Sequence, residues 1–321
     1  MNRYFVILLV ILHVTTKRVV SYVTYYSQRT IKRYNKSFFQ SSLTCEEDID
    51  FSEVETFPCT VPVVPSCNVW PHQAAKFLKQ NGVCILLTKE DDILHSNVKK
   101  AADSRLDELK RRIRNRGMDP EGQEDGPFRF TEVVCRDEGG LRYDMPVPWK
   151  NNYDLGTPLS PMESQAISDF HHQIETTVQP VLDVLWNNNN NDDNTFHAVS
   201  SGFLINQPGS LHQGWHRDGP KEGMMNVFCP LIDLKAELGP TEVWSSTHTD
   251  ETSKQKEESN KVAPLLKRGQ LLLMDYRTLH RGLGNESKDT TRTVAYTVFE
   301  KDNDSGGDKH NFPDALTLEY D

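Results

Sequence analysis

The sequence predicts a mainly β domain with flanking helices, and three observations support this fold class. The second half of the chain holds short apolar segments separated by turn residues, a pattern typical of a β-sandwich or barrel. Two long segments, 93–116 and 163–186, are charged and amphipathic with helical spacing. No repeat period divides the chain, and its 321 residues suffice for one large domain or two small ones.

The strands are expected in a definite order along the chain. The segment NGVCILLT at Asn81–Thr88 predicts the first, and Phe128–Pro148 predicts further strands around a Gly-Gly turn. The asparagine-rich tract 187–194 cannot bury itself and predicts a surface loop. The remaining strands are expected at TFHAVSSGFLI, MNVFCPLIDL, GQLLLMDY and TRTVAYTVFEK, and the predicted core of the domain is 196–300.

Charge and cysteine content narrow the classes of partner. The formal net charge is −10 and the pI is near 5.6, so the chain lacks the basic surface with which proteins neutralise phosphates. We therefore expect no nucleic acid partner. The six cysteines are scattered without a C-x-x-C pair, which predicts neither a zinc ribbon nor a disulfide framework. Cys45, Cys59 and Cys67 could pair in an oxidising compartment.

The N-terminus has the composition of a targeting leader. A basic start precedes the apolar run Tyr4–Val14, which is shorter than the roughly 20 residues of a membrane span. It predicts a signal peptide and therefore entry into the secretory pathway. Residues 15–44 are rich in Ser, Thr and Tyr, contain Lys and Arg and lack acidic residues, as transit peptides do.

This leader leaves two destinations open. A signal followed by a transit-like segment is the layout of proteins routed to plastids with extra membranes, whereas a short anchor would hold the protein in the ER or Golgi membrane. We expect a leader at 1–45, one domain at 46–300 and an acidic tail at 301–321. No stable membrane span is expected in the mature chain, and the oligomeric state stays open.

The segment GWHRDGP carries two side chains that can bind a metal. If Trp215–Asp218 is a strand, His216 and Asp218 project from the same face while Arg217 points away, and the Gly-Pro pair that follows ends the strand. An imidazole nitrogen and a carboxylate oxygen would supply two ligands to a divalent metal. A surface hydrogen bond between them is the alternative, because H-x-D alone is a common pair.

Two residues further along extend this pattern. His280 follows the apolar strand GQLLLMDY at its polar end and is the candidate third ligand. In TRTVAYTVF, alternation places Arg292, Val294 and Tyr296 on one face. If this face is interior, the guanidinium needs an anionic partner, because a buried unpaired charge costs several kcal/mol. That partner is either the carboxylate of a ligand or an internal Asp or Glu.

Together these segments resemble the phytanoyl-CoA dioxygenase family of Fe(II)- and 2-oxoglutarate-dependent dioxygenases. The resemblance rests on GWHRDGP, NVFCPLIDL, ELGPTEVWSSTH and GQLLLMDYRTLHRGLGNES, followed by a strand that carries Arg. It is densest at 203–300 and weaker at 69–149. The resemblance implies a double-stranded β-helix, a cupin-like jelly roll. It also implies that His216, Asp218 and His280 hold Fe(II) and that Arg292 binds the distal carboxylate of 2-oxoglutarate.

The implied activity is hydroxylation of a small organic substrate with O₂, releasing succinate and CO₂, with ascorbate as a supporting reductant. Asn206, Gln213 and Thr241 are candidates for cosubstrate contacts, or else hydrogen-bond partners within turns and strands. A zinc hydrolase and a non-catalytic metal-binding jelly roll are the alternatives.

Four further positions are expected around the site or away from it. His212 is expected at the rim of the site and His248 near its mouth, and Arg142 is a candidate for the mouth as well. His171 is expected on the surface of a helix.

Overall fold

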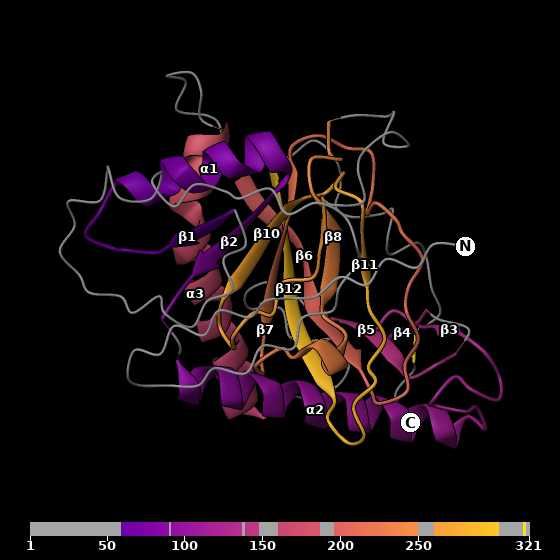
Figure 1. Ribbon diagram of the computed structural model, residues 1–321. Helices are drawn as coiled ribbons and strands as arrows, with labels where there is room; N and C mark the ends of the chain where they lie inside the picture. Colours follow the sequence, from indigo (N-terminus) through magenta and orange to yellow (C-terminus); the bar gives the residue numbers. More distant parts are fainter. Residues whose placement is uncertain are drawn as a thin grey trace, which may run out of the picture. The chain divides into compact units, whose positions relative to one another are not determined.

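The computed structural model describes residues 59–89, 91–136, 139–147, 160–186, 196–249, 260–301 and 317–318. Within them lie three α-helices and two β-sheets, which confirms the predicted mainly β fold class with flanking helices (Figure 1). The helices are α1 (Val69–Asn81), α2 (Asp92–Asn115) and α3 (Pro161–Trp186). The predicted leader at 1–45 lies outside the described residues.

The larger sheet has nine strands in the order β1-β2-β10-β7-β12-β6-β5-β4-β3. Its strands are β1 (Thr60–Pro62), β2 (Val83–Leu87), β3 (Phe128–Arg129), β4 (Val134–Cys135), β5 (Arg142–Pro146), β6 (Phe196–Asn206), β7 (Met224–Pro230), β10 (Leu271–Asp275) and β12 (Arg292–Lys301). The smaller sheet has the order β11-β8-β9, from β8 (Thr241–Trp244), β9 (Lys261–Val262) and β11 (His280–Gly282).

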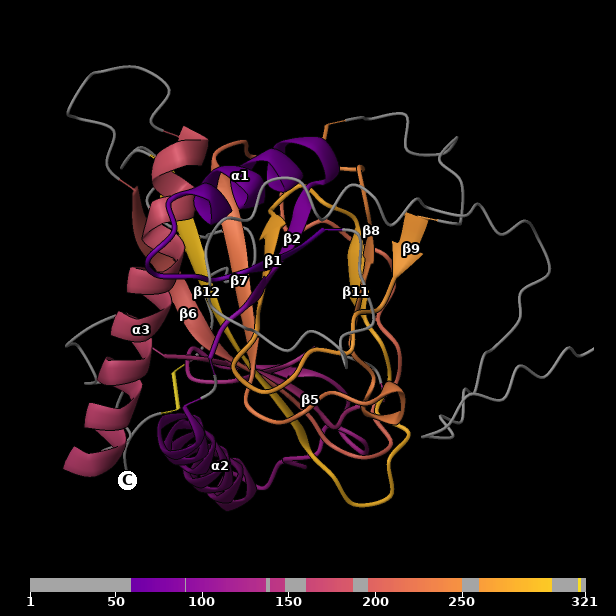
Figure 2. The same ribbon diagram turned by 60° about the vertical axis from the view of Figure 1, so that its left-hand side comes forward.

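The chain alternates between the two sheets in its second half, as a jelly roll requires. β7, β10 and β12 belong to the larger sheet, while β8 and β11 between them belong to the smaller one. Figure 2 shows the smaller sheet on one side of the larger and the helices on the other. The jelly roll that the sequence resemblance implied is thereby confirmed.

The strands β2, β7 and β10 of the larger sheet are buried on both faces, which explains why they are almost continuously apolar. Alternate residues of β10 and β12, such as Leu273 and Phe299, pack into the cluster that contains the helices. Their neighbours, such as Leu272 and Val298, pack into a second cluster on the side of the smaller sheet, which supplies Val243. A pocket lined by residues of both sheets lies on this second side.

The two predicted helices begin at recognisable N-terminal caps. The Asp91 carboxylate accepts the Leu94 N–H at 2.9 Å and starts α2. At the start of α3 the Glu163 carboxylate accepts the Ser160 N–H at 2.8 Å, and the Ser160 hydroxyl oxygen accepts the Glu163 N–H at 3.3 Å. α1 was not predicted, and it ends at Gly82 in the left-handed conformation.

One expectation about a single residue is wrong. His171 is buried, 3% exposed, because it lies on the face of α3 that packs toward the core beside Phe170. The pairing of cysteines was left open by the sequence, and no disulfide joins Cys59, Cys67 or the other described cysteines, all of which are buried. Cys45 lies outside the described residues.

The end of the chain returns to the core. Leu318 is 1% exposed within the helix-side cluster, and its N–H donates to the buried carboxylate of Glu132 at 3.0 and 3.1 Å. Within the predicted acidic tail, only Lys301, Thr317 and Leu318 are described. None of the described helices combines the length and apolarity needed to cross a membrane.

Gly202 sits where three strands approach too closely for a side chain. A Cβ atom there would lie 2.5 Å from the Met145 carbonyl oxygen and 2.7 Å from the Tyr296 hydroxyl. We expect Gly202→Ala to lower the free energy of unfolding by about 1–3 kcal/mol in a urea titration, because the backbone must move to fit the methyl group. Gly214→Ala is the control, since no atom lies within 4 Å of its added Cβ. Equal stability of the two variants would contradict this account.

Candidate metal centre

The backbone places His216 and His280 side by side. Each residue's N–H donates to the other's carbonyl oxygen, at 3.0 and 2.9 Å. This single bridge is the only ladder contact in Trp215–Asp218, so the condition of a regular strand there is not met. The predicted consequence still holds, because His216 and Asp218 both line one pocket with His280.

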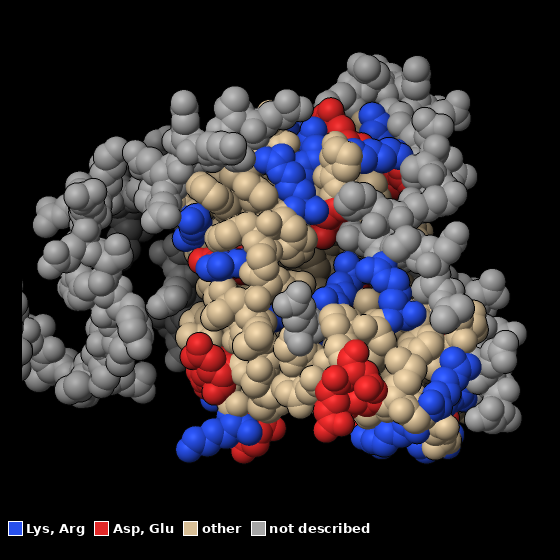
Figure 3. All heavy atoms as spheres, turned by 90° about the vertical axis from the view of Figure 1, so that its right-hand side faces the viewer, with Lys and Arg blue, Asp and Glu red and all other residues tan. Residues whose placement is uncertain are grey.

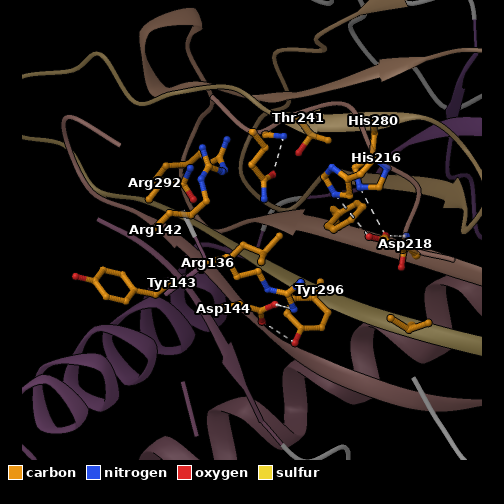
Figure 4. A pocket seen from close by; sticks show the side chains of 17 residues that line it. Arg136, Arg142, Tyr143, Asp144, His216, Asp218, Thr241, His280, Arg292 and Tyr296 are labelled. Carbon is orange, nitrogen blue, oxygen red and sulfur yellow. Dashed lines mark hydrogen bonds and ion pairs between the residues drawn. The ribbon is translucent and has the colours of Figure 1, made fainter. Parts of the chain in front are cut away.

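The three side chains converge on one point (Figure 4). One ligand atom from each lies within 4.8 Å of the others. His216 Nε2 is 3.8 Å from Asp218 Oδ1, and His280 Nε2 is 3.6 Å from Asp218 Oδ2. Two imidazoles and one carboxylate grouped on one side of a cavity form the donor set that binds Fe(II) in non-haem oxygenases.

Hydrogen bonds behind the ligands fix their orientation. His216 Nδ1 lies 2.9 Å from the Gly214 carbonyl oxygen, and His280 Nδ1 lies 3.0 Å from the Thr278 carbonyl oxygen. A carbonyl accepts only, so each Nδ1 carries the hydrogen and each Nε2 lone pair is free for a metal. The Asn226 amide donates to Asp218 Oδ2 at 2.6 Å and holds the carboxylate in the same way.

Electrostatics favour the neutral imidazole that a metal needs. Burial lowers the pKa of His216 below its usual value, and the neighbouring His280 lowers it further. This direction favours the neutral form of His216. The three residues thus fit a divalent metal in ligand type and in separation.

A second group of polar residues forms a row across three neighbouring strands. Arg142 on β5 and Arg292 on β12 are both register partners of Asn206 on β6, which lies between them. All three line the pocket that contains the metal ligands. The Arg142 guanidinium donates to the carbonyl oxygens of Leu211 at 2.6 Å and Leu283 at 3.0 Å.

Arg292 is a buried cation without an acidic partner among the described residues. It is 2% exposed, and its Nε and Nη1 atoms have no hydrogen-bond partner. The alternative of an internal Asp or Glu partner is therefore not found in the described part of the chain. Burial lowers the pKa of Arg292 to about 9, with the nearby charge of Arg142 as a second cause. A bound anion would relieve both effects.

Asn206 also indicates a ligand site beside Arg292. It is fully buried, and neither its amide nitrogen nor its amide oxygen has a hydrogen-bond partner in the described structure. Buried amides are normally satisfied, and an orphaned one that lines a pocket beside an orphaned guanidinium indicates a ligand site. The row of Arg142, Asn206 and Arg292 is suited to a carboxylate.

The other predicted site residues divide into two groups. Gln213 and Thr241 line the pocket, and the Gln213 amide oxygen accepts the Gly282 N–H at 2.9 Å. His212 lies outside the lining, where its Nδ1 accepts the Gly284 N–H at 2.9 Å. His248 is buried against the end of α1, with its Nε2 3.3 Å from the Lys79 carbonyl oxygen, so its expected place near the mouth is wrong.

The sequence did not reveal a third polar group in the pocket. Arg136 Nη2 donates to Asp144 Oδ2 at 2.8 Å, and the Tyr296 hydroxyl donates to Asp144 Oδ1 at 3.0 Å. Burial and the charge of Asp144 raise the pKa of Tyr296 well above its usual value, so the hydroxyl keeps its proton. The only sequence signal was alternation, which placed Tyr296 on the face of Arg292. The apolar lining residues are Leu204, Phe228 and Val298.

The pocket therefore contains three regions of different chemistry: a metal-binding triad, a cationic row and a mixed polar and apolar wall. On the face shown in Figure 3, Lys and Arg side chains gather beside a central hollow, although the net charge of the chain is −10. Local positive charge of this kind favours the entry of anions.

Comparisons with known proteins agree with this geometry. The protein named Dioxygenase hkm4 from Aspergillus hancockii is 33% identical over 107 residues, which are 29% of this chain and 35% of that protein. Dioxygenase easH from Epichloe festucae var. lolii is 31% identical over 101 residues, which are 28% of this chain and 55% of that protein. The matches thus span about a third and about half of the length of these curated relatives.

A solved structure and a family model extend the likeness. The crystal structure of AviO1 from Streptomyces viridochromogenes Tue57 superposes with a TM-score of 0.50 at 15% identity, over 73% of this chain and 96% of that chain, which shows a shared fold. Residues 153–294 match the family model described as phytanoyl-CoA dioxygenase (PhyH). Because this match includes the metal-binding triad and Arg292, the resemblance of the chain to the phytanoyl-CoA dioxygenase family is confirmed.

Proposed function

We propose that this protein is an Fe(II)- and 2-oxoglutarate-dependent dioxygenase that hydroxylates a small organic substrate and releases succinate and CO₂. One observation carries the proposal above the others. A buried arginine without an acidic partner among the described residues lines the same pocket as a group of two histidines and one aspartate. A metal site alone explains the triad, but it does not explain Arg292.

The triad would hold Fe(II) through His216, Asp218 and His280 and leave the opposite side of the metal open to ligands. Together with 2-oxoglutarate and O₂, the metal would supply the oxidising chemistry that inserts oxygen into a C–H bond. The chain's own contribution is to orient the ligands. Backbone carbonyls hold both imidazoles by Nδ1, and Asn226 holds the carboxylate.

The cationic row would bind the distal carboxylate of 2-oxoglutarate. Arg292 can donate two parallel hydrogen bonds to a carboxylate, and Asn206 can donate a further one from its orphaned amide. Arg142 adds a second positive charge beside Arg292. The row would thus present two positive charges to the distal carboxylate. We propose Gln213 and Thr241 as further polar contacts, since both line the same pocket.

The alternatives account for less of the pocket. A zinc hydrolase needs a base that is free to activate water, yet Asp144, the described carboxylate that lines the pocket besides Asp218, already accepts from Arg136 and Tyr296. A non-catalytic metal-binding module has no need of Arg292 or of the orphaned Asn206. Neither alternative uses the cationic row.

The substrate would lie against the remaining wall of the pocket. That wall combines Leu204, Phe228 and Val298 with the Arg136–Asp144 ion pair, so it fits a small molecule with an apolar body and a polar group. Ascorbate would support turnover by keeping the iron reduced.

We also propose that residues 1–45 are a leader that directs the chain into the secretory pathway, with a plastid or an ER or Golgi membrane as its destination. The support is compositional: an apolar run of signal-peptide length and a following basic segment without acidic residues. The catalytic domain would then begin near Glu46.

The triad assignment is tested by His216→Ala, Asp218→Ala and His280→Ala. We expect each variant to lose succinate formation from 2-oxoglutarate and to bind Fe(II) more weakly, because each removes one of three ligands. Each should still unfold cooperatively, since the side chains line a pocket outside the helix-packed core. His172→Ala, on the exposed face of α3, is the control. A triad variant with near-normal succinate formation would remove that residue from the site.

Arg292→Lys tests the cosubstrate. It keeps the charge but loses the planar pair of donors, so the KM for 2-oxoglutarate should rise roughly ten- to more than a hundredfold while Fe(II) affinity stays unchanged. Arg277→Lys is the matched control, because Arg277 pairs with Asp275 and does not line the pocket. An unchanged KM beside a lowered melting temperature would mean that Arg292 has a structural role instead.

The leader is tested by a chain that starts at Glu46. We expect this shortened protein to be soluble and to form succinate at the rate of the full chain, because residues 1–45 lack a periodic apolar face that could pack on the domain. Failure to fold would assign the segment to the domain. A mature protein that still begins at Met1 would rule out cleavage of a signal peptide.

A further inference from the structure

The residues beside the two histidine ligands point away from the metal and toward one common surface. His216 and His280 are bridge partners, so Trp215 and Arg281 also lie opposite each other, on the other face. Arg281 belongs to β11, which pairs with β8, whereas Trp215 belongs to no strand. Backbone hydrogen bonds from Gln213 to Gly282 and between His216 and His280 flank Trp215, and side-chain contacts hold the Trp215 ring itself.

A stack of rings and cations provides that contact. The Arg281 guanidinium carbon lies 4.8 Å from the centre of the Trp215 ring, and Arg281 Nε donates to its register partner Glu242 at 2.7 Å. The Trp215 ring is 5.7 Å from the ring of Trp244 on β8. Lys261 Nζ covers both rings, at 5.4 Å from Trp215 and 4.5 Å from Trp244. Cations at these distances attract the ring faces.

The next residues of the two ligand segments attach to the same element. Arg217 Nη2 donates to the Thr247 carbonyl oxygen at 2.8 Å, and the Thr247 hydroxyl accepts the Leu279 N–H at 2.8 Å. The Trp244 N–H in turn donates to the Leu279 carbonyl oxygen at 2.8 Å. Residues on both sides of each histidine are thus fixed to β8 and the turn that follows it.

We infer that Trp215 and Arg281 form a brace, a pair of positioning residues that sets the separation of His216 and His280 from behind the metal site. The inference rests on the proposed function, because it assigns a role toward the metal. Its physical basis is that a ligand on irregular backbone needs support from packing if it is to stay within metal-binding distance of its partners. The stack supplies that support to His216, and the Glu242 ion pair extends it to His280.

The experiment measures Co(II) binding, by the visible absorption of the bound metal, in Trp215→Leu, Arg281→Met and the double variant. We expect each single change to raise the Co(II) dissociation constant roughly three- to thirtyfold. The double variant should bind no more weakly than the worse single variant, because both changes remove the same contact. The metal-free melting temperatures should stay close to that of the unaltered protein.

Two conservative variants and one change at a neighbouring residue are the controls. Trp215→Phe keeps a ring, and Arg281→Lys keeps a cation beside Glu242, so both should recover most of the affinity. Lys261→Met removes the cation above the same two rings but leaves Trp215 in contact with Trp244 and Arg281, so it should raise the Co(II) dissociation constant less than either Trp215→Leu or Arg281→Met.

The outcomes separate the brace from the proposed function. Unchanged Co(II) affinity in Trp215→Leu and Arg281→Met, or melting temperatures that fall while affinity stays constant, would overturn the brace alone. If the unaltered protein binds no Co(II), or if His216→Ala binds it equally well, the metal site itself is wrong and the proposed function fails.

Discussion

The buried guanidinium of Arg292 is the constraint from which the rest of the site follows. A cation held at 2% exposure without an acidic partner among the described residues is costly, and the nearby charge of Arg142 adds to that cost. The two strands on either side of β6 nevertheless bring both arginines to Asn206, in the pocket that the metal-binding triad also lines. The surrounding fold enforces this arrangement. In the proposed function, a bound carboxylate would offset its cost.

The jelly roll explains how one pocket can combine this cationic row with a metal site. Long strands of the larger sheet supply Arg142, Asn206 and Arg292, while the short strands and irregular segments of the opposite side supply the metal ligands. The helices cover the far face of the larger sheet, while the second apolar cluster and the pocket lie on its other face. Regular backbone thus fixes the cationic row, and hydrogen bonds from the two imidazoles to backbone carbonyls fix the metal-binding triad.

The sequence predicted those features that depend on local pattern or on the spacing of ligand types. Both amphipathic helices, the alternating face of β12 and the grouping of His216, Asp218 and His280 were visible in this way. Features that depend on distant partners were not visible. The role of Arg142 depends on a register with β6, and that of Asn226 depends on where the Asp218 carboxylate comes to rest.

The differences between expectation and structure also arise from contacts with distant partners. A strand at Trp215–Asp218 was the condition under which His216 and Asp218 would share a face, yet only one bridge pairs this segment, and side chains contact β8 and the turn after it. His248 lacked any local signal that α1, itself not predicted, would pack against it. In each case a contact between segments far apart in the sequence outweighed the local preference.

The central claim is that the metal-binding triad and the cationic row bind one molecule between them. Calorimetric titration of 2-oxoglutarate and of glutarate into Fe(II)-loaded protein without oxygen tests this most directly, because the two ligands share both carboxylates and differ in the keto oxygen that reaches the metal. The account predicts one 2-oxoglutarate per chain, bound much more tightly than glutarate, with the difference lost when the metal is removed. Equal affinity for the two ligands, or no binding of 2-oxoglutarate, would contradict it.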